Sequence, residues 1–211
     1  MPTTAGQMKL ISAQYSIVIV NPAITPSAAE AYREWQQFGK LTNKILIPPL
    51  FRAEIGANIA IQVPEGKVEL IFKSLNLEEG FQKVKEIAQA LLSAFGAFTT
   101  RAVGINLNGI WIHPDFNFEK WRKKIFTRAV MNKNQILTSE IKLGLKMPGF
   151  IRHLTCTEFQ KGGEKGIQIN VNNHFDLEQE NVYENYDEVI SKASEIIRET
   201  IIDVEKNWLT V

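Results

Sequence analysis

The sequence predicts an α+β fold: a broad curved antiparallel sheet with two long helices packed on one face. Two tight turns in the region 136–176, Met147-Pro148-Gly149-Phe150 and Lys161-Gly162-Gly163-Glu164, join runs of strand-like residues. Elsewhere, alternating apolar residues predict further strands, and apolar residues three or four apart predict long helices. Together these patterns favour a sheet that helices cover on its apolar side and that stays polar on the other.

The two turns predict one register for the three strands that they join. If each turn is a two-residue loop, Leu143 lies opposite Leu154, and Leu154 lies opposite Val171. Both turns then place the same residues on the same face. The apolar face holds Ile141, Leu143, Leu145, Leu154, Cys156, Ile167, Ile169, Val171 and Phe175. The polar face holds Glu140, Lys142, Lys146, His153, Thr155, Thr157, Gln168, Asn170, Asn172 and His174.

Composition restricts the class of protein. The chain has 211 residues, 45% hydrophobic and 22% charged, which is typical of a globular protein and enough for one large domain. Its net charge of +1 gives no general electrostatic reason to bind nucleic acid or an anionic membrane. The single cysteine, Cys156, excludes an internal disulfide and fits a reducing compartment. No apolar run approaches the ~20 residues of a membrane span, and the N-terminus lacks a signal-peptide pattern. We expect a cytoplasmic protein, with residues 1–7 flexible.

The first half begins with a strand, a short helix and an apolar connector. Residues 9–20 alternate as a strand that Asn21-Pro22 ends. Ser27 followed by Glu30 predicts a capping box and a short helix to about Phe38. Residues 45–50 predict an apolar connector, which Pro48-Pro49 holds extended.

Two antiparallel strands are expected next. Residues 51–63 alternate apolar and polar side chains almost without a break and predict a single strand. A Glu-Gly turn leads into a second strand, 67–74, which places Ile61 opposite Leu70.

Each half ends in a predicted long helix. Asn76 caps the first, and the last helix spans about 183–208. The core-facing residues of the first helix are Leu77, Phe81, Val84, Ala88, Leu91 and Phe95. Those of the last helix are Tyr186, Val189, Ala193, Ile197, Ile201, Val204 and Trp208.

The second half repeats the element order of the first. Residues 101–113 predict a strand with Asn106 and Asn108 on its polar side, and a short helix follows over about 116–131. This helix carries Trp121, much as the first short helix carries Trp35.

This order predicts one domain (1–211) made of two duplicated halves, about 8–98 and 99–209. The order strand, short helix, antiparallel strands, long helix resembles the saddle of the TATA-binding-protein-like folds. The resemblance is of element order alone, with no sequence motif of that family, so it implies a saddle-shaped sheet and no function.

The polar face of the predicted sheet provides one candidate binding site. The register places His153 diagonal to His174, with polar side chains around them. The candidate ligand-binding residues are Lys142, His153, Thr155, Asn170, Asn172 and His174. A solvated sheet face, in which His and Thr pair across strands, explains the same pattern. Metal sites usually need three or four converging ligands, so no metal and no cofactor is expected.

A basic helix provides a second candidate site, for an anionic partner. Residues 119–128, EKWRKKIFTR, combine several cations with an aromatic ring that stacks on a base if exposed. The residues of this set are Arg101, Lys120, Trp121, Arg122, Lys124 and Arg128. An amphipathic helix with its Trp in the core gives the same pattern.

Asparagine is unusual in strands, yet Asn170, Asn172 and Asn173 occur together in INVNNHF. This indicates either an edge strand or a ligand-facing surface. Cys156 points to the apolar face and both histidines to the polar face, which argues against a Cys–His nucleophile.

These observations favour a non-enzymatic binding or assembly protein that presents its polar sheet face to a protein partner or to a second copy, as a homo-oligomer. One alternative is a binder of a small ligand or of nucleic acid. Another is an enzyme that uses His153 or His174. The sequence identifies neither the ligand nor the partner.

Overall fold

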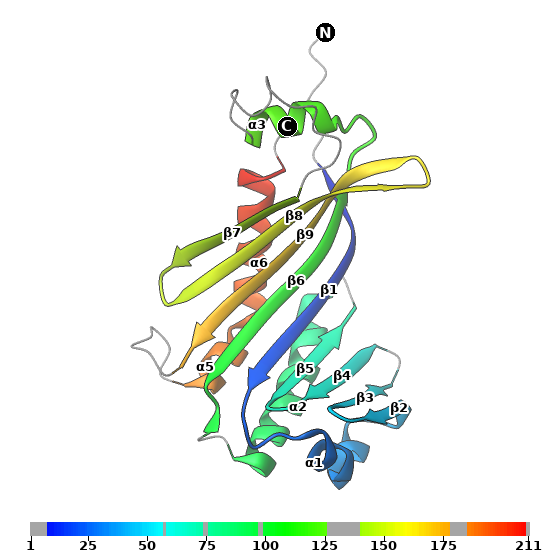
Figure 1. Cartoon of the computed structure of the whole chain (residues 1–211), viewed down its shortest axis with the longest axis vertical. Coiled ribbons are helices and arrows are strands. Elements are labelled where there is room, and N and C mark those ends of the chain that lie inside the picture. The colour runs from blue at the N-terminus through cyan, green and yellow to red at the C-terminus, as the bar shows by residue number, and fades with distance from the viewer. Residues whose placement is uncertain are drawn as a thin grey trace.

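A computed structural model of the chain describes residues 8–56, 58–73, 76–96, 99–125, 140–177 and 185–209. They form one open nine-stranded antiparallel sheet in the order β2-β3-β4-β5-β1-β6-β9-β8-β7 (Figure 1). The strands are β1 (Lys9–Val20), β2 (Leu41–Ile47), β3 (Leu50–Ile55), β4 (Ile59–Pro64), β5 (Lys67–Phe72), β6 (Ala102–Ile112), β7 (Glu140–Met147), β8 (Phe150–Lys161) and β9 (Glu164–Asp176). The helices are α1 (Pro26–Ala31), the 3-10 helix η1 (Arg33–Gln37), α2 (Leu77–Phe95), α3 (Phe118–Ile125), α5 (Tyr186–Ser191) and α6 (Ala193–Asn207).

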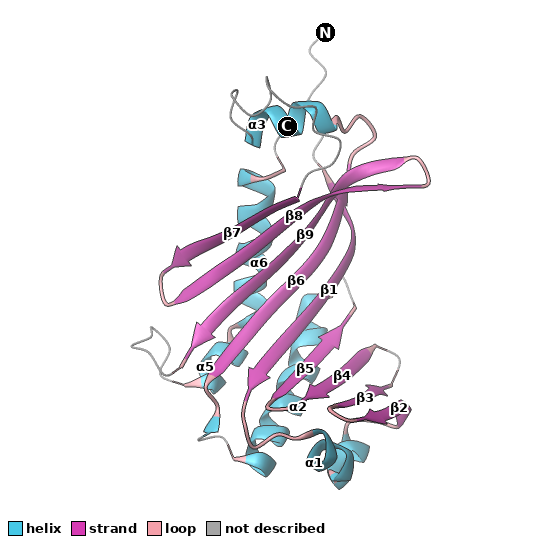
Figure 2. Ribbon diagram, in the orientation of Figure 1, coloured by secondary structure: helices cyan, strands magenta, loops and turns pink. Residues whose placement is uncertain are grey.

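The predicted α+β class with an antiparallel sheet is confirmed. Figure 2 shows the two long helices, α2 and α6, on the same side of the sheet. Along each central strand, every second residue faces these helices and is buried in a common core. Ile17, Leu70 and Ile105 are examples. None of the described helices has the length and apolar character of a membrane span.

Strands from the two halves of the chain meet at the centre of the sheet. β1 pairs with β6 along almost its whole length, with Ile17 opposite Ile105. β5 flanks β1 on one side, and β9 flanks β6 on the other. The open face of the sheet, defined as the face opposite α2 and α6, therefore runs without a break from one half to the other.

The predicted register of β7, β8 and β9 is confirmed. Leu143 lies opposite Leu154, and Leu154 lies opposite Val171. Gly149 and Gly163 have φ values of 80° and 86°, which a side chain would strain, so the turn glycines hold this register.

The predicted single strand over 51–63 is wrong, because the chain reverses within it. β3 and β4 form a hairpin in which Ile55 pairs with Ile59, and Gly56 enters the turn with a φ of 59°. Because Ile55 pairs with Ile59, the odd-numbered residues of β3 and of β4 lie on the same face of the sheet. The alternation of apolar residues therefore continues through the turn and hides it.

The predicted connector over 45–50 is also wrong, because its first residues belong to β2. Five of the seven residues of β2 before Pro48 pair with β3, and Pro48-Pro49 forms the turn between them. All residues of β2 after Leu41 are exposed. An exposed strand has no buried side and hence no alternation to detect.

The helix boundaries differ in part from the prediction. Thr25, and not Ser27, is the N-cap of α1; its Oγ1 accepts a hydrogen bond of 3.2 Å from the backbone N–H of Ala28. The expected last helix begins at Tyr186 and is divided at Lys192 into α5 and α6.

Other helix predictions agree with the structure as far as it describes them. Asn76 caps α2, because its Oδ1 accepts from the Glu79 N–H at 3.4 Å. The short helix expected over 116–131 is described as α3, and its residues beyond Ile125 lie outside the described part of the chain.

A buried polar network joins the sheet to α6. Arg152 on β8 is 3% exposed; its Nε donates to Asn173 Oδ1 at 2.8 Å, and its Nη2 donates to Thr200 Oγ1 at 3.1 Å. Its Nη1 pairs with Asp203 Oδ2 at 2.8 Å. Asn173 also donates to the carbonyl of Ile105 at 3.2 Å. The buried polar groups of Arg152 and Asn173 thus hold the sheet against α6.

Candidate functional site

Two rows of polar side chains cross the middle of the open face. Each row runs through β1, β6, β9 and β8, because residues in register on neighbouring strands point to the same side. The first row is Ser16, Asn106, Asn172 and His153, and the second is Gln14, Asn108, Asn170 and Thr155. None of the described helices packs on this face.

These rows enclose a shallow depression, the amide hollow, with a volume of about 300 Å³. Its lining residues are Gln14, Ser16, Glu69, Asn106, Leu107, Asn108, His153, Thr155, Asn170, Val171 and Asn172. Most of its polar groups are side-chain amides, which both donate and accept hydrogen bonds.

A series of hydrogen bonds orients the floor of the amide hollow. The Ser16 hydroxyl is 4% exposed and donates to Glu69 Oε1 at 2.9 Å. Its one proton is then used, so Ser16 accepts from Asn106 Nδ2 at 3.1 Å. This fixes Asn106 Oδ1 as an acceptor, and no donor among the described residues reaches that buried atom. An acceptor left in this way costs about 1–3 kcal/mol of stability.

The structure brings together part of the ligand-binding set predicted from sequence. His153, Thr155, Asn170 and Asn172 line the amide hollow. His174 lies on the same face, diagonal to His153 as predicted, but outside the lining.

Lys142 lies on β7, away from the amide hollow. It pairs with Glu140 at 3.1 Å on the same strand. Sequence reasoning missed Gln14, Ser16 and Glu69, because it did not predict which strands of the two halves adjoin.

The position of β9 excludes one explanation of its asparagines. β9 lies between β6 and β8 and is hydrogen-bonded on both sides, so Asn170 and Asn172 are not edge residues. A ligand-facing surface and a solvated sheet face are both compatible with these two positions, whereas Asn173 is buried on the core side.

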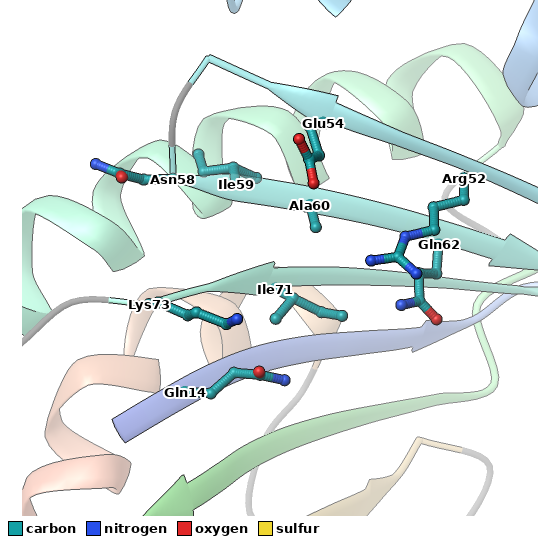
Figure 3. A pocket seen from close by; sticks show the side chains of 9 residues that line it. All are labelled: Gln14, Arg52, Glu54, Asn58, Ile59, Ala60, Gln62, Ile71 and Lys73. Atoms are coloured by element: carbon teal, nitrogen blue, oxygen red, sulfur yellow. The ribbon is translucent and has the colours of Figure 1, made fainter. Parts of the chain in front are cut away.

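A second depression, the charged hollow, lies on the open face of β3, β4 and β5 (Figure 3). Its volume is about 190 Å³. Its lining residues are Gln14, Arg52, Glu54, Asn58, Ile59, Ala60, Gln62, Ile71 and Lys73. Gln14 lines both hollows, so they adjoin on the same face.

A larger depression of about 480 Å³ lies between α1, η1 and β2. Most side chains at its margin, such as Glu30, Arg33 and Lys44, are exposed. Burial and a hydrogen bond to Glu34 raise the pKa of Tyr32 to about 12, which keeps this phenol neutral. This region shows no converging set of oriented polar groups like that of the amide hollow.

The basic helix α3 is partly neutralised within the fold. Arg122 forms a two-pronged pair with Glu158, at 2.5 and 2.7 Å. Lys123 pairs with Glu119. Trp121 is fully buried and donates to the carbonyl of Trp208, so its ring is not available to stack on a base.

Lys120 and Lys124 also belong to α3, whereas Arg101, another member of the predicted anionic-partner set, lies far from this helix. Arg101 precedes the first residue of β6, whereas Lys120 and Lys124 follow its last residue, so the length of β6 separates them. At ~3.3 Å per residue this strand is roughly 35 Å long. Arg128 lies outside the described residues.

Among the described residues, the cysteine and histidine side chains on β8 and β9 that could act as a nucleophile or a base do not converge. Burial raises the pKa of Cys156 to about 12, and this thiol lies on the core side of β8, whereas His153 lies on the open face. Neither His153 nor His174 forms a hydrogen bond or an ion pair with another described residue. Within the described ranges, no three His, Cys, Asp or Glu side chains are placed to hold a metal ion.

Comparisons of the sequence and fold with protein-family models, with curated proteins and with solved structures find no match. The residues of the open face are therefore the basis on which a function can be inferred.

Proposed function

We propose that this protein is a non-enzymatic binding or assembly protein whose open face binds a protein partner. The observation that carries the proposal is the presence of Asn106, Asn108, Asn170 and Asn172 at solvent-facing positions of two interior strands. Asn is disfavoured in strands, where Thr or Val fits the pleated surface better. Four such residues in register indicate that this surface serves something other than the stability of the sheet.

The chemistry of the amide hollow fits a polypeptide. Side-chain amides complement the N–H and C=O groups of a peptide backbone, and polar, partly wet contacts are usual at protein interfaces. Among the residues that line this hollow, Glu69 is the one acidic side chain, and there is no Lys or Arg. A phosphate backbone would meet no cation there, so nucleic acid fits the amide hollow less well than protein does.

A small polar ligand is the second candidate. The 300 Å³ of the amide hollow lies at the lower end of the volumes that hold small molecules. The side-chain amides of its lining can both donate hydrogen bonds to such a ligand and accept them from it.

The saddle arrangement and the internal duplication belong to the same proposal. The strand order supports them, because β1 and β6 adjoin at the centre, with β5-β4-β3-β2 following outward on one side and β9-β8-β7 on the other. The buried Trp35 and Trp121 follow β1 and β6, respectively. A saddle of this kind presents its open face as one continuous surface.

Self-association is one form of the proposed assembly, and the outer strand β2 supports it. Ile45, Leu46 and Ile47 are 44, 39 and 67% exposed, and the outer side of β2 pairs with no other described strand. Apolar, unpaired strand edges associate readily. We expect Ile45→Lys with Ile47→Lys to lower the solution mass measured by light scattering, whereas Ile202→Lys on α6, also an exposed isoleucine, leaves it unchanged.

Site-specific photocrosslinking tests the main proposal. A photoreactive amino acid is placed at Asn170 in the amide hollow, and at Glu199, an exposed residue of α6 on the other side of the molecule, as the control. In cells that naturally make this protein, we expect a discrete protein adduct from position 170 and none from 199. Equal adducts from both positions, or none from 170, would contradict the proposal; a small-molecule ligand gives no protein adduct.

A further inference from the structure

We propose that the charged hollow binds a carboxylate group of the partner polypeptide, an inference that rests on the proposed function of the open face. The ligand class is a single carboxylate, from an acidic side chain or from the C-terminus of a polypeptide. Charge, shape and position each support this assignment.

Two cations converge on a small apolar floor. Arg52 on β3 and Lys73, just after β5, extend from opposite ends of the hollow toward Ala60 and Ile71 (Figure 3). Neither cation forms a hydrogen bond or an ion pair with another described residue. A guanidinium and an ammonium that face one another across an apolar floor form a site for an oxyanion.

The charge balance selects a monoanion. Arg52 and Lys73 contribute +2 and Glu54 contributes −1, so the charged lining residues sum to +1. Glu54 is kept at the hollow by a hydrogen bond of 2.5 Å from Asn43 Nδ2. A carboxylate neutralises this site, whereas a dianionic phosphate leaves an excess negative charge beside Glu54.

The size and surroundings fit one group of a longer polypeptide. A volume of about 190 Å³ is below that of sites for whole small molecules, but it accommodates a carboxylate and the carbons that carry it. Gln14 and Gln62 add amide donors at the margin. Because Gln14 also lines the amide hollow, one extended segment can place its acid in the charged hollow and its backbone on the amides.

Peptide titrations followed by NMR test this inference on the full-length protein. The probes are acetyl-Gly-Ala-Glu-Ala-Gly-amide, the same peptide with Gln, the same peptide with phosphoserine, and acetyl-Gly-Ala-Gly-Ala-Gly with a free C-terminal carboxylate. The readout is the shift of the backbone amide signals of Ala60 and Ile71. We expect the Glu peptide to shift these signals and the Gln peptide to leave them in place. A response to the last probe identifies a peptide terminus, rather than a side chain, as the preferred source of the carboxylate.

Charge-removing variants supply the controls. Arg52→Gln and Lys73→Gln should each weaken binding of the Glu peptide about tenfold, the usual effect of losing one charged hydrogen bond. Both residues are exposed, so the fold should tolerate the changes. Lys161→Gln removes the same charge at the exposed β8–β9 turn and should have no effect.

Three results would overturn the inference: identical shifts with the Glu and Gln peptides together with no response to the peptide that has a free C-terminal carboxylate, tighter binding of the phosphoserine peptide, or unchanged affinity for the carboxylate peptide in Arg52→Gln. If any of these results is found while the photoreactive residue at position 170 still gives its protein adduct, the carboxylate site alone is rejected. If position 170 also gives no protein adduct, the proposed function of the open face is rejected with it.

Discussion

Asn172 and Asn173 are neighbours in the sequence but lie on opposite faces of the sheet. Asn173 is completely buried and bonds to Arg152, to Thr200 and to the carbonyl of Ile105. Asn172 is exposed at the amide hollow and has no side-chain hydrogen bond to another described residue. The same side chain is thus held by hydrogen bonds within the fold on one face and exposed on the other.

The comparison shows how to separate structural from functional polar residues in a sheet. A polar residue that the fold uses is buried with its hydrogen bonds satisfied, and replacing it is costly. A polar residue kept for binding contributes little to stability, and a better strand former should replace it without harm.

The largest contrast is expected between Arg152 and His153. Arg152→Met removes the buried cation together with its hydrogen bonds to Asn173 and Thr200 and its ion pair with Asp203, so we expect a loss of about 3–5 kcal/mol in the free energy of unfolding. His153→Met, on the open face, should change it by less than about 0.5 kcal/mol. Denaturant unfolding measures both; equal losses would contradict the distinction between the two faces.

The asparagine pair gives the next largest contrast. Asn173→Ala removes an acceptor of Arg152 and a donor to the Ile105 carbonyl, with an expected loss of about 2–3 kcal/mol. Asn172→Ala should stay within about 0.5 kcal/mol of the wild type. A cost for Asn172→Ala as large as that for Asn173→Ala would show that the open face is structural.

Cys156 and Thr155 form a third adjacent pair. Burial raises the pKa of Cys156 from 9.0 to about 12, so the folded protein retains the thiol proton over a range in which the unfolded protein loses it. This contribution to stability is complete below about pH 9 and is lost as the pH rises toward 12, because the deprotonated unfolded state is then favoured. When the pH is raised from about 8 to about 10, the free energy of unfolding of the wild type should fall by about 1.4 kcal/mol more than that of Cys156→Ala, as measured by denaturant unfolding at each pH.

Thiol labelling provides a second measurement of this pair. At about pH 8 the wild-type thiol should resist a thiol reagent, whereas Thr155→Cys should add a thiol that reacts quickly. Rapid labelling of the wild type under native conditions would show that Cys156 is not enclosed.

The smallest effect is a gain in stability. Asn170→Thr with Asn172→Thr replaces two poor strand formers on the open face, and we expect an increase of up to about 1 kcal/mol, seen as a higher Tm. A lower Tm would mean that these asparagines stabilise the sheet and are not reserved for a partner.

The parts of this fold that depend on local patterns could be predicted from the sequence. Pro148-Gly149 and Gly162-Gly163 set the register of β7, β8 and β9, because each turn leaves one pairing that keeps the apolar side chains together. The hairpin at Gly56 was missed, because its odd-numbered turn preserves the alternation. β2 was missed, because both of its faces are exposed.

Only the part of the candidate site that lies on β8 and β9 could be predicted, because a tight turn joins these two strands. His153 and Asn170 could be placed on one surface, because the second hairpin joins their strands. The pairing of β1 with β6, and of β6 with β9, joins segments far apart in the sequence, and no turn specifies it. The hydrogen bonds that link Glu69, Ser16 and Asn106, and the whole charged hollow, depend on these pairings or on the missed hairpin, so they required the structure.

One crosslinking experiment can decide whether the open face is a binding surface. The photoreactive amino acid at position 170 is compared in the wild-type background and with Asn108→Thr and Asn172→Thr added, two exposed asparagines of this face. We expect the protein adduct to be lost or strongly reduced while the variant remains folded, with an unchanged or raised Tm. An adduct of undiminished yield in a folded variant would contradict this expectation.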